Sequence, residues 1–282
     1  MVDKVSVHGG HSGEFCSHAK DPLEAVVAEY VRQGFVWIAL TEHMASSDAF
    51  LAVEELAHGF DEAEAFHRFE HYFEEARRLQ SAYADDIDIM VAFETEAYSG
   101  YQTEVAALVE EFHPDYLVGS VHHVNDVPFD ASPGDYLDAV AKAGGMAAMY
   151  CDYFDLQLEL IDAFRPAVVG HFDLIRIHDG DYAQTLQDPN VWERAARNLE
   201  RIAELDLILD FNVRALAKGQ PEPYVSEPLL RLAKELGIVC VPGDDSHGTA
   251  TVGAGMAEGI AVLIEAGFDT DWPKPDVMQH SR

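Results

Sequence analysis

Residues 238–248 read Ile238-Val239-Cys240-Val241-Pro242-Gly243-Asp244-Asp245-Ser246-His247-Gly248 and join an apolar run to a polar segment. The run 238–241 is typical of a buried strand. A carboxylate at Asp245 and an imidazole at His247 follow it closely, and flanking glycines relax the backbone. A polar turn is the alternative interpretation. A strand that ends in such side chains is, however, typical of the functional end of a parallel α/β barrel.

Six further runs resemble this one, and segments with helical spacing separate them. The predicted strands are 5–7, 36–40, 87–93, 116–121, 167–170, 207–211 and 238–241. The predicted helices are 23–33, 54–83, 102–112, 134–164, 189–205, 225–236 and 253–266. Seven alternating units predict the α/β class and favour a barrel over an open sheet. We expect one domain over residues 1–270 and a loosely attached C-terminal tail over 271–282.

The charge balance is strongly acidic. With 18 Lys+Arg against 51 Asp+Glu, the 282 residues carry a formal charge of −33, while 48% are apolar and 10% aromatic. This apolar content is enough for one large core and excludes general disorder. A negative field of this size repels nucleic acid and anionic lipid, so we expect a small substrate as the partner, with no nucleic acid and no membrane.

An acidic excess also suits a salt-rich cytoplasm, where screening shortens the range of charge repulsion to about 3 Å at 1 M salt. We therefore predict that the melting temperature rises steeply with KCl, because screening relieves repulsion among the acidic side chains. Thermal melts over increasing KCl concentrations check this. A protein that is equally stable in dilute buffer would remove the hypothesis.

Cys16, Cys151 and Cys240 are too few, and odd in number, for a disulfide framework. No stretch nears the roughly 18 apolar residues of a membrane span, so the sequence predicts a cytoplasmic protein. Cys16 stands near His18, and we interpret it as a structural thiol or one that supports a ligand rather than as a nucleophile. The chain contains no Gly-x-Gly-x-x-Gly, Gly-x-x-x-x-Gly-Lys-Ser/Thr or Gly-x-Ser-x-Gly motif, which disfavours nucleotide-cofactor enzymes and α/β hydrolases.

Side chains that bind metals follow six of the seven predicted strands. They are His8 and His11, His43, Glu94, His122 and His123, His171 and Asp173, and Asp245 and His247, with Asn212 after the sixth strand. A single histidine is more often a surface or core residue than a ligand. Because the carboxyl ends of parallel strands meet on one face, however, we expect this set to converge. Mixed nitrogen and oxygen donors suit Zn, Mn or Fe, and the set predicts two or three divalent ions.

Other polar side chains are expected away from this centre. Glu96 is interpreted as a group that supports a ligand or faces solvent. The acids Glu62, Glu64, Glu74 and Glu75 are expected on a solvent-facing helix surface. The remaining histidines, His58, His67, His71, His113, His178 and His280, fall in predicted helices, loops or the tail.

Several segments carry a resemblance to a known family. They are His8-Gly9-Gly10-His11-Ser12-Gly13 with Cys16-Ser17-His18, Thr41-Glu42-His43, Gly119-Ser120-Val121-His122-His123-Val124-Asn125, Val169-Gly170-His171-Phe172-Asp173-Leu174 and Asp244-Asp245-Ser246-His247-Gly248. Over nearly its whole length the chain resembles the histidinol-phosphate phosphatases of the PHP (polymerase and histidinol phosphatase) superfamily. The resemblance implies a PHP-type, distorted (β/α)7 barrel with a trinuclear metal cluster. The implied ligands are His8, His18, His43, Glu94, His122, His171, Asp245 and His247.

The first departure from the family pattern lies at Ser6. The family opens with His-x-His, whereas this chain reads Ser6-Val7-His8, so serine stands at the first ligand position. Three alternatives follow: His11 supplies the ligand, a water does, or the site holds two ions only.

The second departure concerns the phosphate. The family's Asn-x-x-x-Leu-Arg pattern begins here at Asn212 but has Ala217 in place of its arginine. Arg176 is the first candidate for gripping phosphate, because guanidinium matches phosphate bidentately. The alternative for Arg176 is a surface ion pair with Asp173 or Asp179. The expected catalytic residues are Asp245, His247 and Arg176, and the expected substrate-binding residues are Arg176, Arg214, Lys218 and His123.

The activity that the resemblance implies is hydrolysis of L-histidinol phosphate to L-histidinol and phosphate, in histidine biosynthesis, by attack of a metal-bridging hydroxide. Two alternatives stay open. One is a PHP-type phosphoesterase for another small phosphorylated metabolite. The other is a metal-binding relative with impaired catalysis, suggested by Ser6 and Ala217. A nuclease is disfavoured because the basic surface it needs is missing. The sequence favours no particular oligomeric state.

Overall fold

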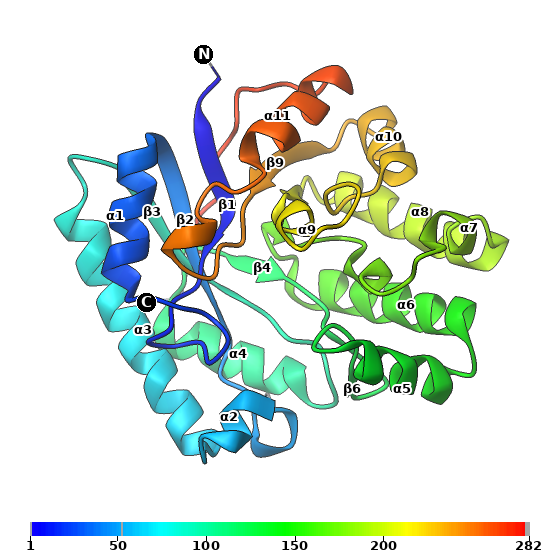
Figure 1. Ribbon diagram of the computed structural model, residues 1–282, viewed down its shortest axis with the longest axis horizontal. Coiled ribbons are helices and arrows are strands. Elements are labelled where there is room, and N and C mark those ends of the chain that lie inside the picture. The colour runs from blue at the N-terminus through cyan, green and yellow to red at the C-terminus, as the bar shows by residue number, and fades with distance from the viewer. Residues whose placement is uncertain (1, 52, 280–282) are drawn as a thin grey trace.

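Seven parallel strands form the centre of the part of the chain that this computed structural model describes, residues 2–51 and 53–279 (Figure 1). Their order in space is their order in the chain, so each unit packs beside the one before it. The strands are β1 (Lys4–Gly10), β2 (Phe35–His43), β3 (Asp88–Glu94), β4 (Leu117–Gly119), β7 (Val168–Val169), β8 (Ile208–Asn212) and β9 (Val239–Gly243).

The first and last strands meet and nearly close the sheet into a barrel. Past the end of β9, the Asp245 N–H donates to the His8 carbonyl at 2.9 Å, and the His11 N–H donates to the Ser246 carbonyl at 2.7 Å. The predicted distorted (β/α)7 barrel is therefore confirmed. Because the strands are parallel, their carboxyl ends share one face.

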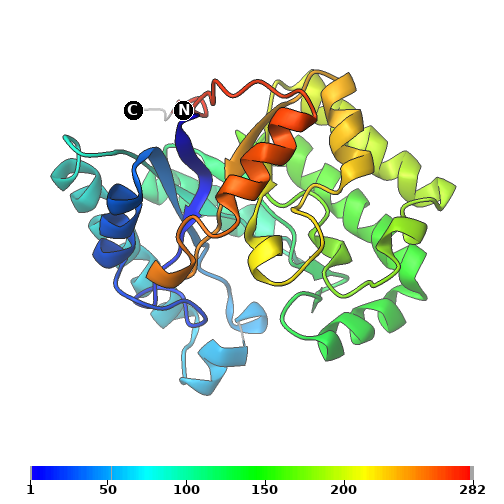
Figure 2. The same ribbon diagram turned by 45° about the horizontal axis from the view of Figure 1, so that its top comes forward.

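Helices surround the strands on the outside, as Figures 1 and 2 show. They are α1 (Leu23–Gln33), α2 (Val53–Ala57), α3 (Glu62–Ala82), α4 (Tyr101–Phe112), α5 (Pro133–Ala143), α6 (Met146–Phe164), α7 (Tyr182–Thr185), α8 (Pro189–Glu204), α9 (Arg214–Ala217), α10 (Glu227–Glu235) and α11 (Met256–Glu265). Short 3-10 turns are η1 (Asp48–Phe50), η2 (Leu174–Arg176) and η3 (Thr249–Thr251). The alternation of strand and helix agrees with the prediction.

Two helices predicted as continuous are each divided in two. The segment 54–83 is interrupted between α2 and α3, where Gly59 has a φ of 79°. The segment 134–164 is interrupted between α5 and α6, where Gly144 has a φ of 88° and Gly145 a φ of 138°. Glycine adopts these left-handed conformations without the steric cost that other residues would meet, so these glycines can end the helices. The helical periodicity of the sequence continues across both breaks, and it therefore predicted a single helix in each segment.

A short hairpin after β4 was not predicted. It consists of β5 (His123–Val124) and β6 (Val127–Pro128), which pair antiparallel. The two residues that connect them, Asn125 and Asp126, have φ values of 53° and 60°, as tight two-residue turns require. The hairpin brings Asp130 to the carboxyl-end face of the barrel.

The described part of the tail is held against the barrel, contrary to the expectation of loose attachment. The Trp272 indole N–H donates to the Asp3 carbonyl at 3.0 Å, and the Met278 N–H donates to the Asp115 carbonyl at 2.8 Å. Figure 2 shows this segment passing the start of β1. Trp272 is 7% exposed, so its burial explains the attachment. The division at residue 270 stays a prediction, and His280 lies outside the described residues.

None of the helices in the described part of the chain has the length and apolar character that a membrane crossing requires. Cys16, Cys151 and Cys240 are all present as free thiols.

Candidate metal centre

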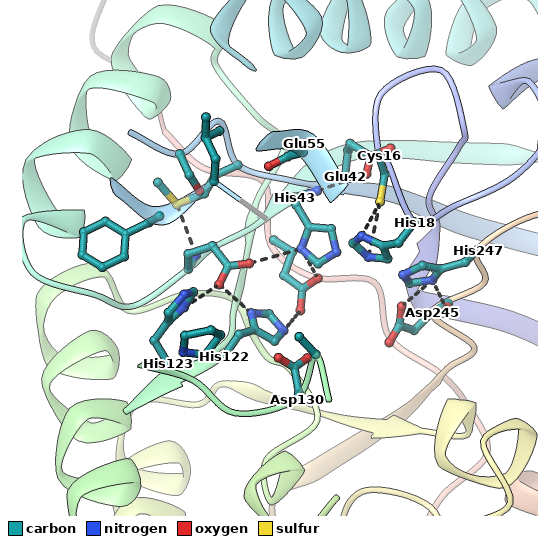
Figure 3. A pocket seen from close by; sticks show the side chains of 18 of the residues that line it. Cys16, His18, Glu42, His43, Glu55, His122, His123, Asp130, Asp245 and His247 are labelled. Carbon is teal, nitrogen blue, oxygen red and sulfur yellow. Dashed lines mark hydrogen bonds and ion pairs between the residues drawn. The ribbon is translucent and has the colours of Figure 1, made fainter. Parts of the chain in front are cut away.

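A cavity of about 470 Å³ lies at the carboxyl ends of the strands. Figure 3 shows His18, His43, His122, Asp245 and His247 gathered around it. All eight predicted ligands belong to groups of donors whose ligand atoms lie within 4.8 Å of one another. The structure thus brings together side chains from β1 itself, from the loops after β1, β4, β7 and β9, and from the ends of β2 and β3.

Glu94 lies at the middle of this cluster and has five imidazoles within 4 Å, of which that of His11, at 3.9 Å, is the most distant. Its Oε1 is 2.7 Å from His171 Nε2 and 3.4 Å from His122 Nε2, and its Oε2 is 3.3 Å from His43 Nδ1 and 3.4 Å from His8 Nε2. Burial alone would raise the pKa of Glu94, but the facing imidazoles outweigh it and hold the pKa well below its usual range. Glu94 is therefore an anion at neutral pH.

A bulge in β1 explains how two histidines reach the centre from one strand. Between Ser6 and Gly10 the chain takes four steps along β1 against two along β2. Gly9 permits this path, because a Cβ there would lie 1.9 Å from a carbonyl oxygen of β2. Both His8 and His11 are consequently buried within the cluster.

The bulge also explains why His11, and not Ser6, lies among the possible ligand atoms. The Ser6 hydroxyl lies 2.6 Å from Asp244 Oδ1, in a buried network that the ligand groups do not include. His11 instead places Nδ1 3.2 Å from Glu42 Oε1 and Nε2 3.3 Å from Asp245 Oδ1. Of the three alternatives, the one in which His11 supplies the ligand agrees with this geometry, and the choice among them stays a prediction.

Glu96 forms a second edge of the centre. Its Oε2 is 2.8 Å from His122 Nδ1 and 3.5 Å from His123 Nδ1, and its Oε1 is 3.3 Å from His43 Nδ1. Glu96 is 8% exposed, so the solvent-facing interpretation is wrong. Burial would raise the pKa of Glu96, but His122 outweighs that effect and holds the pKa well below its usual range.

The remaining edge is built from His18, His43 and His247. The ring centroids of His18 and His43 are 5.1 Å apart, and those of His18 and His247 are 4.9 Å apart. Burial lowers the pKa of His18 to about 3 and also lowers the pKa of His247 well below its usual value. Both rings are therefore neutral at pH 7, which is the form that binds metal ions.

The unpaired atoms of the centre fit divalent ions. Among the described residues, His8 Nε2, His11 Nε2, His43 Nε2 and Asp245 Oδ1 are buried without a hydrogen-bond partner. In addition, His122 Nε2 and His171 Nε2 lie only 3.3 Å apart. Buried polar atoms without partners are costly, and cations would satisfy them. Imidazole and carboxylate donors together suit Zn, Mn or Fe.

Sequence reasoning missed two acidic members of the site, Glu42 and Asp210, and left the place of a third open. Glu42 pairs with His11, and Asp210 Oδ2 lies 2.9 Å from His8 Nδ1 and accepts from the His171 N–H at 3.2 Å. The third is Glu96, which was considered only as a supporting or solvated group. Asp210 stands inside an apolar strand, where an acidic residue needs a buried partner, and that was the available signal.

Arg176 does not line the cavity. Its side chain is 1% exposed, with Nε 3.2 Å from Asp173 Oδ2 and Nη2 donating to the carbonyls of Glu222 at 2.9 Å and Pro223 at 2.7 Å. The guanidinium also stacks 4.6 Å from the Tyr224 ring centroid. These contacts hold the guanidinium away from the cavity lining, so the geometry does not support its predicted catalytic and phosphate-binding roles, which stay predictions. The predicted alternative named the right partner, Asp173, but the ion pair is buried rather than on the surface.

The other predicted substrate-binding residues do line the cavity: Arg214, Lys218 and His123. Arg214 follows β8 at the start of α9, and its Nε is buried with no hydrogen-bond partner among the described residues. Lys218 is exposed at the end of α9. Outside the cavity lining are His58, His67, His71, His113 and His178, as predicted.

Comparison with known proteins gives consistent matches. Residues 9–214 match the model of the PHP domain. A protein of Schizosaccharomyces pombe with the name "Probable histidinol-phosphatase" is 36% identical over 253 residues, covering 88% of this chain and 82% of that protein. The crystal structure of HisK from Listeria monocytogenes has a TM-score of 0.80 at 26% identity and covers 90% of this chain and 99% of that chain.

A second solved structure shares the fold. It is the histidinol phosphate phosphatase of Lactococcus lactis, complexed with Zn, L-histidinol and phosphate. Its TM-score is 0.74 at 21% identity, and the match covers 95% of each chain.

Proposed function

Because the chain belongs to the PHP-domain family, within its histidinol-phosphatase group, we propose that it hydrolyses L-histidinol phosphate to L-histidinol and phosphate with the help of divalent metal ions. The observation that carries the proposal is the convergence of imidazoles and carboxylates on one cavity with several ligand atoms left unpaired. Such a set is typical of a metal site, because several of its buried ligand atoms have no hydrogen-bond partner among the described residues.

The residues fall into overlapping groups that would hold the ions. These are His8, His11 and Asp245; His8, Glu94 and His171; His11, His43 and Glu94; His43, Glu96 and His122; and Cys16, His18, His43 and His247. When bound, divalent ions supply positive charge for the phosphoryl oxygens and lower the pKa of water. Asp245 and His247, predicted as catalytic, would act as members of these groups. Asp210 and Glu42 orient His8 and His11.

Arg214 is the proposed phosphate contact. Its Nε–H is a buried donor with no hydrogen-bond partner among the described residues. A phosphoryl oxygen in the cavity would accept this hydrogen bond. We expect Arg214→Ala to lower kcat/KM by roughly 10- to 100-fold, since a hydrogen bond to a charged group contributes about 1.5–3 kcal/mol. Steady-state kinetics measure this. Lys218→Ala is the control, with a smaller loss because Lys218 is exposed; equal activity in Arg214→Ala and the parent protein would contradict the role.

Carboxylates at the rim suit the cationic half of the substrate. Asp130 and Glu55 line the cavity and lie on different sides of it (Figure 3). We expect Asp130→Asn to raise KM for histidinol phosphate about tenfold, since a charge-assisted hydrogen bond to the ammonium is lost. Turnover of p-nitrophenyl phosphate, which has no ammonium group, should be unchanged. Asp126→Asn, in the turn of the hairpin that precedes Asp130 and bonded to Ser99, is the matched control. A parallel loss with both substrates would contradict charge recognition.

The test of the function combines metal analysis with substrate selection. Protein purified without chelators is analysed for metals, and phosphate release is measured for histidinol phosphate and for a panel of sugar and nucleotide monophosphates. A clear preference for histidinol phosphate is expected. A preference for another compound would favour the related phosphoesterase. Metal-loaded protein that hydrolyses none of them would favour impaired catalysis, although Ser6 lends that alternative no support because it contacts Asp244 instead.

The composition supports the remaining parts of the proposal. The charge of −33 supports a small substrate rather than nucleic acid. The three free thiols support a reducing, cytoplasmic location.

A further inference from the structure

Cys16 lies among histidines of the metal centre. Its Sγ is 3.3 Å from both ring nitrogens of His18. Together with His43 and His247, these residues offer four ligand atoms that all lie within 4.8 Å of one another. Figure 3 shows the thiol pointing toward the His18 ring.

The loop between β1 and α1 fixes this position from both ends. The Cys16 N–H donates to the Ser12 carbonyl at 2.9 Å, and the Ala19 N–H donates to the Cys16 carbonyl at 3.3 Å. Further along, the Lys20 N–H donates to the His247 carbonyl at 3.0 Å, which ties the loop to the segment after β9. Cys16 is 5% exposed yet lines the cavity, so the backbone holds its thiol at the site.

The chemistry of the four donors is distinct from that of the rest of the centre. One sulfur and three imidazoles form a complete tetrahedral set for zinc, whereas the neighbouring groups contain carboxylates. Thiolate is a soft ligand that favours zinc over manganese or magnesium. An imidazole–thiol hydrogen bond would use His18 alone, whereas His43 Nε2 is also buried with no hydrogen-bond partner among the described residues.

We propose that Cys16, as a thiolate, is the fourth ligand of an ion held by His18, His43 and His247, and that this position of the centre selects zinc. The inference rests on the metal-dependent function proposed above. On binding, the thiol proton passes to water and the sulfur lone pair forms the bond to the ion, so no oxidant or reductant is needed.

Cobalt substitution of the full-length protein tests the proposal. Metal-free protein is loaded with Co²⁺, and we expect a thiolate-to-cobalt charge-transfer band in the near ultraviolet. The band should be absent in Cys16→Ser and present in Cys151→Ser, whose thiol lies on α6 outside the cavity. A loaded parent protein without the band, or a band that persists in Cys16→Ser, would overturn the assignment. A parent protein that lacks the band overturns the assignment even if Cys16→Ser does not fold, and a band that persists in a Cys151→Ser, Cys240→Ser double variant supports it.

Zinc retention gives a second measurement. In competition with a chelator, Cys16→Ser should lose at least about tenfold in affinity at one ion position, since even outer partners of ligands contribute 10- to 100-fold. Unchanged affinity at every position would count against Cys16. Different results would overturn the two proposals. A protein that shows the band but hydrolyses no phosphomonoester overturns the proposed function alone. A protein that binds cobalt and hydrolyses histidinol phosphate, but lacks the band, overturns the Cys16 assignment alone.

Discussion

Glu94→Gln is expected to abolish most of the activity and to reduce the metal content of the purified protein. Glutamine keeps the shape of the side chain but removes the negative charge that His8, His43, His122 and His171 share. The loss in kcat/KM should exceed the roughly 10- to 100-fold that loss of a supporting partner costs. Phosphate release from histidinol phosphate and elemental analysis measure the two effects.

Glu74→Gln is the matched control for this variant. Glu74 lies exposed on α3, so the same chemical change there should alter neither metal content nor turnover. His171→Ala and Asp245→Ala should follow Glu94→Gln and lose both metal and activity, since both belong to the same ligand groups. A Glu94→Gln protein that keeps its metal ions and its rate would refute the central place given to this carboxylate.

The strand ends could be predicted from the sequence because one geometric rule governs them. Parallel strands deliver whatever follows them to a common face, so His43, Glu94, His122 and His171 could be placed without knowing any long-range contact. Helix α1 was predicted with the correct bounds for a similar local reason. Gly34 ends it with a φ of 77°, and its N–H bonds to the last turn.

Features decided by distant contacts could not be read in this way. The orientation of the Arg176 side chain depends on hydrogen bonds to the carbonyls of Glu222 and Pro223, and no local sequence pattern connects these residues to it. The bulge that turns His11 inward depends on the pairing of β1 with β2, and the sequence showed only a pair of glycines. The loop that carries His18 has no periodicity, so only the family resemblance pointed to that residue.

Metal loading is expected to release protons at neutral pH, because several ligands are protonated in the metal-free protein. Burial would lower the pKa of His11, but the adjacent carboxylates of Asp245 and Glu42 outweigh it and raise the pKa to about 9. Burial would also lower the pKa values of His8 and His122. Neighbouring carboxylates outweigh this effect and raise both pKa values well above their usual range. Each proton displaced should make the apparent metal affinity rise about tenfold per pH unit.

The stability of the metal-free protein should change with pH in the opposite direction from the metal affinity. A histidine whose folded pKa is raised stabilises the fold below its unfolded value of about 6.5 and loses that contribution as pH rises toward about 9 for His11. The carboxylates Glu94 and Asp245, whose pKa values are lowered against the opposing effect of burial, contribute fully throughout this range and lose their contribution only in acid. Between pH 6.5 and 9, the melting temperature of metal-free protein should therefore fall.

Melting curves of loaded and metal-free protein across this range, with calorimetric titrations in buffers of different ionisation enthalpy, measure both effects. The gap between the two melting temperatures should widen as pH rises, because ions replace the protons that the metal-free centre gives up. His11→Gln should flatten the slope of the metal-free protein, whereas His67→Asn, on the exposed face of α3, should leave it unchanged. A metal-free melting temperature that is constant or rising up to pH 9, or metal binding without proton release, would show that the carboxylates of the centre do not hold these imidazoles in their charged form.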